Sequence, residues 1–160
     1  MKVNNTRQNY ISYILSVLLA LAVGALSGLI SGGSMMQYET LIKPPFSPPG
    51  WLFPVVWTIL YVLMGIAAAK VWNSRHAERD TALTLYGVQL AVNFFWPIFY
   101  FLFGARLLAL LWLVLLIYLV FLNLKYFNEI SMSAAWLLLP YFIWLIYALY
   151  LNFGTYLLNR

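Results

Sequence analysis

Five long apolar stretches follow one another along the chain, and clusters of polar or turn-forming residues separate them. They run from about residue 11 to 30, 51 to 69, 82 to 103, 107 to 124 and 134 to 158. Each holds roughly 18 to 25 residues, the length that an α-helix needs to cross ~30 Å of hydrocarbon. Strict alternation of apolar and polar positions, which is typical of membrane barrels, is missing. The pattern predicts an all-α membrane bundle of five transmembrane helices in one domain, over about residues 10–32, 49–72, 81–103, 106–126 and 133–157.

The composition agrees with this class and narrows the chemistry. Only 8% of the 160 residues are charged, against about 25% in soluble domains. The chain has no cysteine, its one histidine, His76, lies in a charged linker, and its four acidic residues lie in linkers or at helix ends. We therefore expect no metal site, no ion-coupled pump and no carboxylate-based hydrolase. The net charge of +5 is explained by loops that face lipid headgroups, so we expect no nucleic-acid partner.

The positive residues also predict an orientation. Six lie at the amino end and in the second and fourth linkers, and three lie at the other face: Lys2, Arg7, Lys70, Arg75, Arg79 and Lys125, against Lys43, Arg106 and Arg160. The positive-inside rule then places the amino terminus in the cytoplasm. The first apolar stretch exceeds the usual length of a signal-peptide core, about 7 to 15 residues, so we expect a retained helix.

The first linker contains KPPFSPPG at Lys43–Gly50, with four prolines in six residues. Proline lacks an amide proton and fixes φ, so this segment is not a regular helix. We expect a stiff, extended cap at one membrane face, with Pro48 and Pro49 at the start of the second helix.

Two groups of residues inside the spans are candidates for a site. Gln89 and Asn93 share one face of the third span near Trp96, and buried amides must find partners. Four of the seven tryptophans lie deep in spans or beside prolines, and aromatic walls with a few polar groups are typical of ligand pockets: Trp57, Trp96, Trp136 and Trp144. A stripe of small residues in the first span indicates close packing, either within the bundle or in a dimer: Ala20, Gly24, Gly28 and Gly32.

Three motifs together resemble the TspO/MBR family of tryptophan-rich sensory proteins and translocator proteins (peripheral benzodiazepine receptors), in a bacterial member. They are KPPFSPPGWLFPVVWTILYVLMG, QLAVNFFWPIFYFLFGAR and AAWLLLPYFIWLIYALYLN, at Lys43–Gly65, Gln89–Arg106 and Ala134–Asn152. The resemblance implies a five-helix bundle, a homodimer, and a pocket beneath the first loop that binds porphyrins such as protoporphyrin IX. No cofactor is required, and the expected location is the bacterial plasma membrane. The implied role is tetrapyrrole sensing, sequestration or transport; alternatives are light- and oxygen-dependent porphyrin degradation, or translocation of sterols, lipids or other small molecules.

The resemblance also implies roles for single residues. Trp57 and Trp144 would form the pocket and would be catalytic if photodegradation occurs. Our expected ligand-binding set joins the implied residues to the amides and tryptophan above: Tyr38, Trp57, Gln89, Asn93, Trp96, Trp144 and Ala148. The loop cap would be Lys43, Pro44, Pro45 and Phe46, with Lys43 near the ligand's carboxylates. The family's sterol motif has a tyrosine and an arginine where this chain has Phe153 and Leu157.

Overall fold

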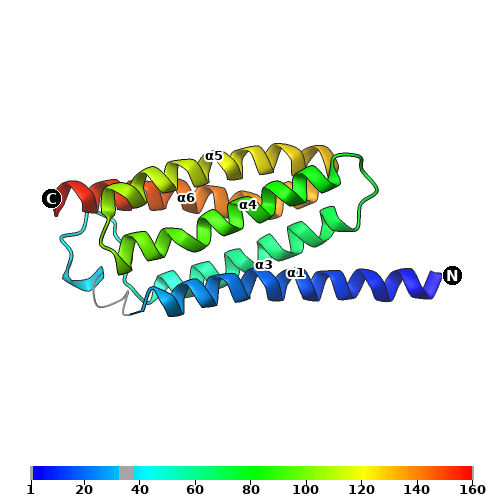
Figure 1. Cartoon of the computed structure of the whole chain (residues 1–160), viewed down its shortest axis with the longest axis horizontal. Helices are drawn as coiled ribbons and strands as arrows, with labels where there is room; N and C mark the ends of the chain where they lie inside the picture. The colour runs from blue at the N-terminus through cyan, green and yellow to red at the C-terminus, as the bar shows by residue number, and fades with distance from the viewer. Residues whose placement is uncertain (1, 33–37, 160) are drawn as a thin grey trace.

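The computed structural model describes residues 2–32 and 38–159, with side chains described from residue 9 onward. Over these residues the chain forms helices joined by short connections, and no strand (Figure 1). Five stretches in this part of the chain are long and apolar enough to cross a membrane, which confirms the predicted class. The elements are α1 (Lys2–Ile30), α3 (Leu52–Trp72), α4 (Arg79–Pro97), the π-helical segment η1 (Ile98–Leu102), α5 (Arg106–Ile130) and α6 (Met132–Leu158).

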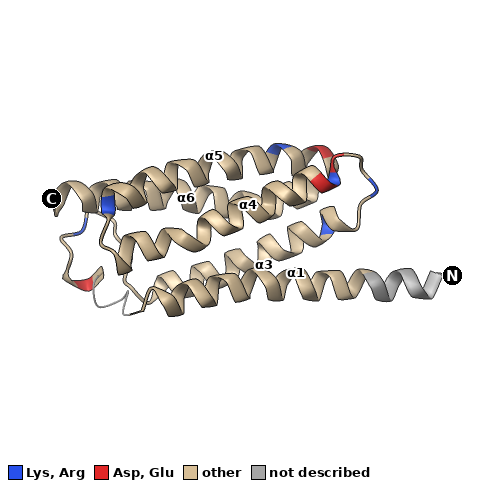
Figure 2. Ribbon diagram, viewed as in Figure 1, with Lys and Arg blue, Asp and Glu red and all other residues tan. Residues whose placement is uncertain are grey.

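The long helices lie side by side in one bundle. α1 packs along α3, α3 along α6, α6 along α5 and α5 along α4, while α4 returns to α1. The segment 38–50 and the carboxyl terminus lie at one end, and the amino terminus lies at the other with the α3–α4 and α5–α6 connections (Figure 1). Charged residues gather at these two ends and leave the middle of the bundle free (Figure 2). Of the charges used above for orientation, the side chains of Lys2, Arg7 and Arg160 lie outside the described residues.

The bundle is apolar both inside and outside. Tyr141, Leu138 and Met64 are fully buried at its centre. Large apolar side chains such as Leu29 and Leu111 are exposed on its surface. In water such a surface would drive association, whereas in a bilayer these side chains contact lipid tails of equal polarity. The distribution is therefore that of an integral membrane protein.

Small residues let α1 and α3 approach each other closely. A methyl group at Gly65 would lie 2.5 Å from Val17 Cα, and one at Gly24 would overlap the ring of Tyr61. Ala20 is fully buried. The first two residues of the predicted small-residue stripe, Ala20 and Gly24, therefore serve packing inside the bundle. Around Gly28, by contrast, there is open space.

The third span departs from a continuous α-helix. Pro97 has no N–H, so the Asn93 carbonyl lacks its α-helical donor and the regular ladder stops there. The chain continues as a π-turn, in which Phe103 N donates to Ile98 O at 3.0 Å. The expected α-helix over 81–103 is thus α4 followed by η1.

The proline-rich segment also differs in detail from the expectation. α3 begins at Leu52 rather than 49, with Leu52 N donating to Pro49 O at 3.0 Å. The segment is not extended throughout, because Phe46 has φ of 63° and the Ser47 hydroxyl donates to Pro44 O at 2.7 Å. Together they turn the chain back over the end of the bundle.

Candidate ligand-binding site

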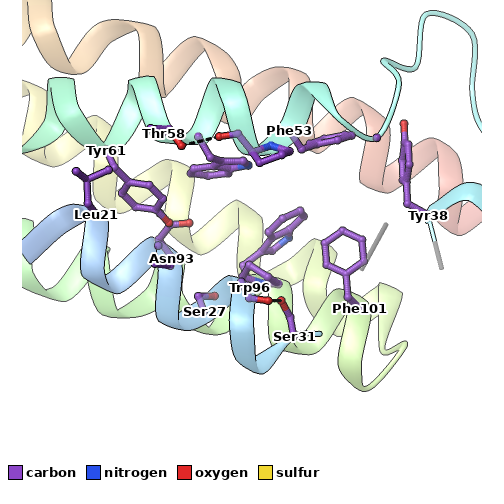
Figure 3. A pocket seen from close by; sticks show the side chains of 17 residues that line it. Leu21, Ser27, Ser31, Tyr38, Phe53, Thr58, Tyr61, Asn93, Trp96 and Phe101 are labelled. Atoms are coloured by element: carbon purple, nitrogen blue, oxygen red, sulfur yellow. Dashed lines mark hydrogen bonds between the residues drawn. The ribbon is translucent and has the colours of Figure 1, made fainter. Parts of the chain in front are cut away.

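A cavity of about 560 Å³ lies beneath the segment 38–50, between α1, α3 and the α4–η1 junction (Figure 3). Seventeen residues line it: Leu21, Gly24, Ala25, Ser27, Gly28, Ser31, Tyr38, Gly50, Phe53, Pro54, Trp57, Thr58, Tyr61, Asn93, Trp96, Pro97 and Phe101. Most are apolar or aromatic, and a few are polar. This composition is typical of sites for small organic ligands.

The wall formed by α1 owes its shape to small side chains. Gly24, Ala25 and Gly28 line it; Gly24 lets the Tyr61 ring approach α1, and Gly28 leaves open space beside it. Ser27 is buried, and its hydroxyl donates to Phe94 O at 2.7 Å, which ties α1 to α4. The cavity therefore exists because this face of α1 carries small side chains, while the Ser27 hydrogen bond holds α1 close to α4.

Aromatic rings form the two facing walls. Phe53, Trp57 and Tyr61 follow one another at intervals of four residues and so lie on one face of α3. Figure 3 shows Phe53 and Tyr61 of this face across the cavity from Trp96 and Phe101. A flat ligand between these walls would meet rings on both sides.

The π-turn is what places Phe101 in this wall. Five residues along a regular α-helix would rotate Phe101 well away from the face that carries Trp96. The π-turn, closed by the i→i+5 hydrogen bond from Phe103 N to Ile98 O, adds a residue to the turn after Trp96 and so reduces this rotation. The side chains of Trp96 and Phe101 both line the cavity. Trp96 is held by stacking on Tyr100, with centroids 5.4 Å apart. Its indole Nε1 donates to the Asn152 amide oxygen at 3.2 Å when that amide is turned to satisfy both of its groups.

Asn93 supplies a polar group at the inner end. Its Nδ2 donates to the Tyr61 hydroxyl at 3.1 Å. The residue is only 1% exposed, and its Oδ1 has no hydrogen-bond partner. An unpaired buried acceptor costs about 1–3 kcal/mol, so this atom favours a donor that enters the cavity, from a ligand or from water.

Tyr38 closes the other end of the cavity. Its hydroxyl donates to Pro48 O at 3.0 Å, and its ring meets Phe53 edge-on with centroids 5.1 Å apart. Lys43 Nζ lies 4.4 Å from the Tyr38 ring centroid and 2.8 Å from Glu39 Oε2. Burial raises the pKa of Tyr38, so its hydroxyl stays neutral at physiological pH. The hydrogen bond and charge of Lys43 lower the pKa of Glu39.

Side chains of α6 hold the loop above the cavity. Tyr147 donates to Phe46 O at 2.6 Å and Tyr150 to Pro45 O at 2.9 Å. Asn159 exchanges two hydrogen bonds with the Ile42 backbone, at 2.9 and 3.0 Å. Each of these bonds is made to the backbone of the loop. The segment 38–50, which we call the lid, is therefore attached to a helix that does not line the cavity.

The comparison with known proteins shows the family of the chain. The model of the TspO/MBR family matches residues 16–157. The chain belongs to this family. A tryptophan-rich protein TspO of Chlorobaculum tepidum is 40% identical over 144 residues, covering 88% of this chain and 91% of its own.

Two further relatives match this chain over most of their length. Protein CrtK of Rhodobacter capsulatus is 41% identical over 142 residues, covering 85% of each chain. A translocator protein of Ovis aries is 34% identical over 136 residues, covering 82% of this chain and 79% of its own. The family resemblance inferred from the three motifs is confirmed, and the protein is an integral membrane member of that family.

Four of the seven residues expected to bind ligand line the cavity together: Tyr38, Trp57, Asn93 and Trp96. The other three do not line it. Gln89 is buried deeper in the bundle, where its Oε1 accepts from Tyr141 at 3.1 Å. Trp144 and Ala148 are on α6, and Trp144 packs behind Phe53 with centroids 6.0 Å apart.

The four residues expected to form the loop cap lie above the cavity without lining it. Pro44 and Pro45 rest on α6, Phe46 is 90% exposed, and Lys43 lies behind Tyr38, so none of the four lines the cavity. Sequence reasoning missed Phe53, Tyr61 and Phe101. The four-residue spacing of Phe53, Trp57 and Tyr61 is a signal that could have found the first two. Pro97 marks a break in the third span, but it does not say that a π-turn follows and brings Phe101 to the cavity.

Proposed function

We propose that this protein binds a flat, conjugated ligand of the porphyrin class, such as protoporphyrin IX, and acts in tetrapyrrole sensing, sequestration or transport. The observation that carries the proposal is the placing of Trp57 on α3 and Trp96 on α4 around one cavity. Aromatic walls stack well on conjugated rings. The cavity of about 560 Å³ falls within the range of about 300–1,000 Å³ typical of small-ligand sites.

One charged group lies where the edge of such a ligand would be. Lys43 lies against the ring of Tyr38, at the membrane face of the cavity. There the propionate carboxylates of a porphyrin would stay in contact with water and could pair with its ammonium group. Replacing Lys43 by Ala should therefore weaken porphyrin binding, and an unchanged affinity would remove the carboxylate contact from the proposal.

A titration in darkness tests the proposal. Protoporphyrin IX is added to the purified protein while intrinsic tryptophan fluorescence is followed. We expect saturable quenching, and at least a tenfold weaker affinity when Trp57 and Trp96 are both changed to Phe. Trp136→Phe is the matched control, because Trp136 is exposed on the outside of α6. Quenching that never saturates, or that is equally affected by the control, would contradict the proposed site.

Porphyrin breakdown under light and oxygen is the second candidate function. The observation in its favour is that two indoles line the same cavity, where an excited ring would contact them directly. Because Trp144 lies behind Phe53, degradation should depend on Trp57 and Trp96 and be less sensitive to Trp144→Phe. Illumination of the bound complex, with absorption followed against free porphyrin in detergent, decides this: equal bleaching rates would leave only the binding function.

The cellular setting is proposed from the same features. We place the protein in a bacterial plasma membrane with its amino terminus in the cytoplasm, as a homodimer. The relatives named translocator protein make passage of the ligand across the bilayer a further outcome to measure. Uptake of porphyrin into sealed vesicles, compared with empty vesicles, separates a carrier from a protein that only binds.

A further inference from the structure

A second hollow lies on the outside of the bundle, at the end opposite to segment 38–50. This groove, of about 400 Å³, runs between α5 and α6 close to the turn that joins them, and it shares no residue with the cavity. Its lining consists of Phe121, Leu124, Lys125, Asn128, Met132, Ala135, Trp136, Leu139 and Phe142. None of these residues takes part in the function proposed above.

The groove has a polar mouth and an apolar interior. Asn128 and Met132 lie next to the α5–α6 turn, whereas Phe121 and Phe142 lie towards the middle of the bilayer span. The rings of Phe121 and Phe142, with centroids 6.3 Å apart, close the inner end. Trp136 is 61% exposed along one side, as is usual for tryptophan at a membrane interface.

Lys125 brings a positive charge to the lining of this groove. Its Nζ lies 5.5 Å from the Phe121 ring centroid, so the side chain lies back along the groove, one helical turn inward of the mouth. The residue is exposed, and its flexible stem lets the ammonium extend to the interface when an anion is there. Among the residues whose side chains are described, the ion pairs are Lys43–Glu39 and Arg79–Asp80. Lys125 belongs to neither, and Glu129, one turn on, is not within ion-pair distance of it.

We propose that this groove binds one anionic phospholipid. Lys125 and Asn128 hold the phosphate, and an acyl chain lies over Ala135 and Leu139 as far as the two phenylalanine rings. The charge of Lys125 argues for an anionic lipid, because no acidic side chain among the described residues pairs with it. Elsewhere at this end of the bundle basic and acidic side chains are mixed, with Lys70, Arg75 and Arg79 near Glu78 and Asp80 (Figure 2).

Quenching by brominated lipids tests the proposal in reconstituted vesicles. Phosphatidylglycerol or phosphatidylcholine with brominated chains is titrated into an unbrominated bilayer, and the Trp136 signal is taken as the difference between the natural protein and Trp136→Phe. We expect half-maximal quenching at a mole fraction at least threefold lower for phosphatidylglycerol. Lys125→Gln should abolish this preference, because it keeps a side chain of similar length without the charge.

Lys70→Gln is the matched control, since Lys70 is at the same membrane face but outside the groove. It should leave the preference for phosphatidylglycerol unchanged. Equal quenching by the two lipids in the natural protein would overturn the proposal, since ordinary boundary lipid would explain it. An equal loss in both lysine variants would also overturn it, because the selectivity would then belong to the whole charged face.

Discussion

Pro44 of the loop lies directly against Gly154 of α6, where a methyl group would stand 2.7 Å from Pro44 Cβ. This contact sets how closely the lid approaches the helix that carries its hydrogen bonds. Gly154→Ala should lift the loop, lower the free energy of unfolding by about 1–3 kcal/mol and weaken ligand binding. Thermal unfolding in detergent and the porphyrin titration measure the two effects.

Gly87→Ala provides the control for that variant. Gly87 lies within α4, and a methyl group there would meet nothing within 4 Å. Because alanine is the better helix former, this change should stabilise the protein by up to about 1 kcal/mol and leave binding alone. Equal behaviour of the two alanine variants would show that the contact between Pro44 and α6 does not limit the lid.

Gly65→Ala should be the more damaging helix substitution. Its methyl group would approach the backbone of α1 at Val17, and backbone yields less than the end of a side chain. We expect α1 to be pushed from α3, with a loss of several degrees in the unfolding temperature. A melting temperature equal to that of Gly87→Ala would contradict the tight α1–α3 contact.

Gly28→Leu should separate binding from stability. Gly28 lines the cavity and has open space around it, so a leucine side chain would occupy the ligand's volume without a clash. Porphyrin affinity should fall at least tenfold while the unfolding temperature stays within a few degrees of the natural protein. Retained affinity would place the ligand elsewhere.

The Glu39–Lys43 pair predicts a pH dependence. Because Lys43 lowers the pKa of Glu39, the pair contributes stability above the pKa that the carboxyl has in the unfolded chain. This contribution disappears as the pH falls through the lowered pKa of the folded protein. The natural protein should therefore melt slightly higher than Glu39→Gln at pH 7, and the two should converge in acid. Glu129→Gln, which breaks no ion pair among the described residues, should show no such convergence.

The class of fold was readable from the sequence because it depends on length and polarity. Twenty or more apolar residues without charge have no stable place except a bilayer, and the five helices follow from that constraint alone. The ends of the helices were less accessible. Pro48 and Pro49 precede α3 rather than open it, and Pro97 ends the α-helical ladder three-quarters of the way along its span.

The site was only partly readable, because sequence spacing does not say which neighbour a helix face meets. Asn93 and Trp96 share the face of α4 that turns to the cavity, so their pairing could be predicted. Trp144 belongs to a helix packed on the far side of α3, and no local pattern reveals that Phe53 stands in front of it. The small residues of α1 indicated a close approach, but the same stripe serves packing at Gly24 and open space at Gly28.

The hydrogen bonds that hold the lid are accepted by its backbone carbonyls, at Ile42, Pro45 and Phe46. Apart from Pro44, which packs on Gly154, and Tyr38, which closes the cavity, the side chains of this segment take little part in holding it. Single substitutions at its exposed positions should therefore leave the lid in place wherever the turn is kept, and Phe46 in particular should accept other aromatic residues. Adding or removing one residue would shift these carbonyls away from their donors on Tyr147, Tyr150 and Asn159. The segment should therefore tolerate substitutions far more readily than insertions or deletions.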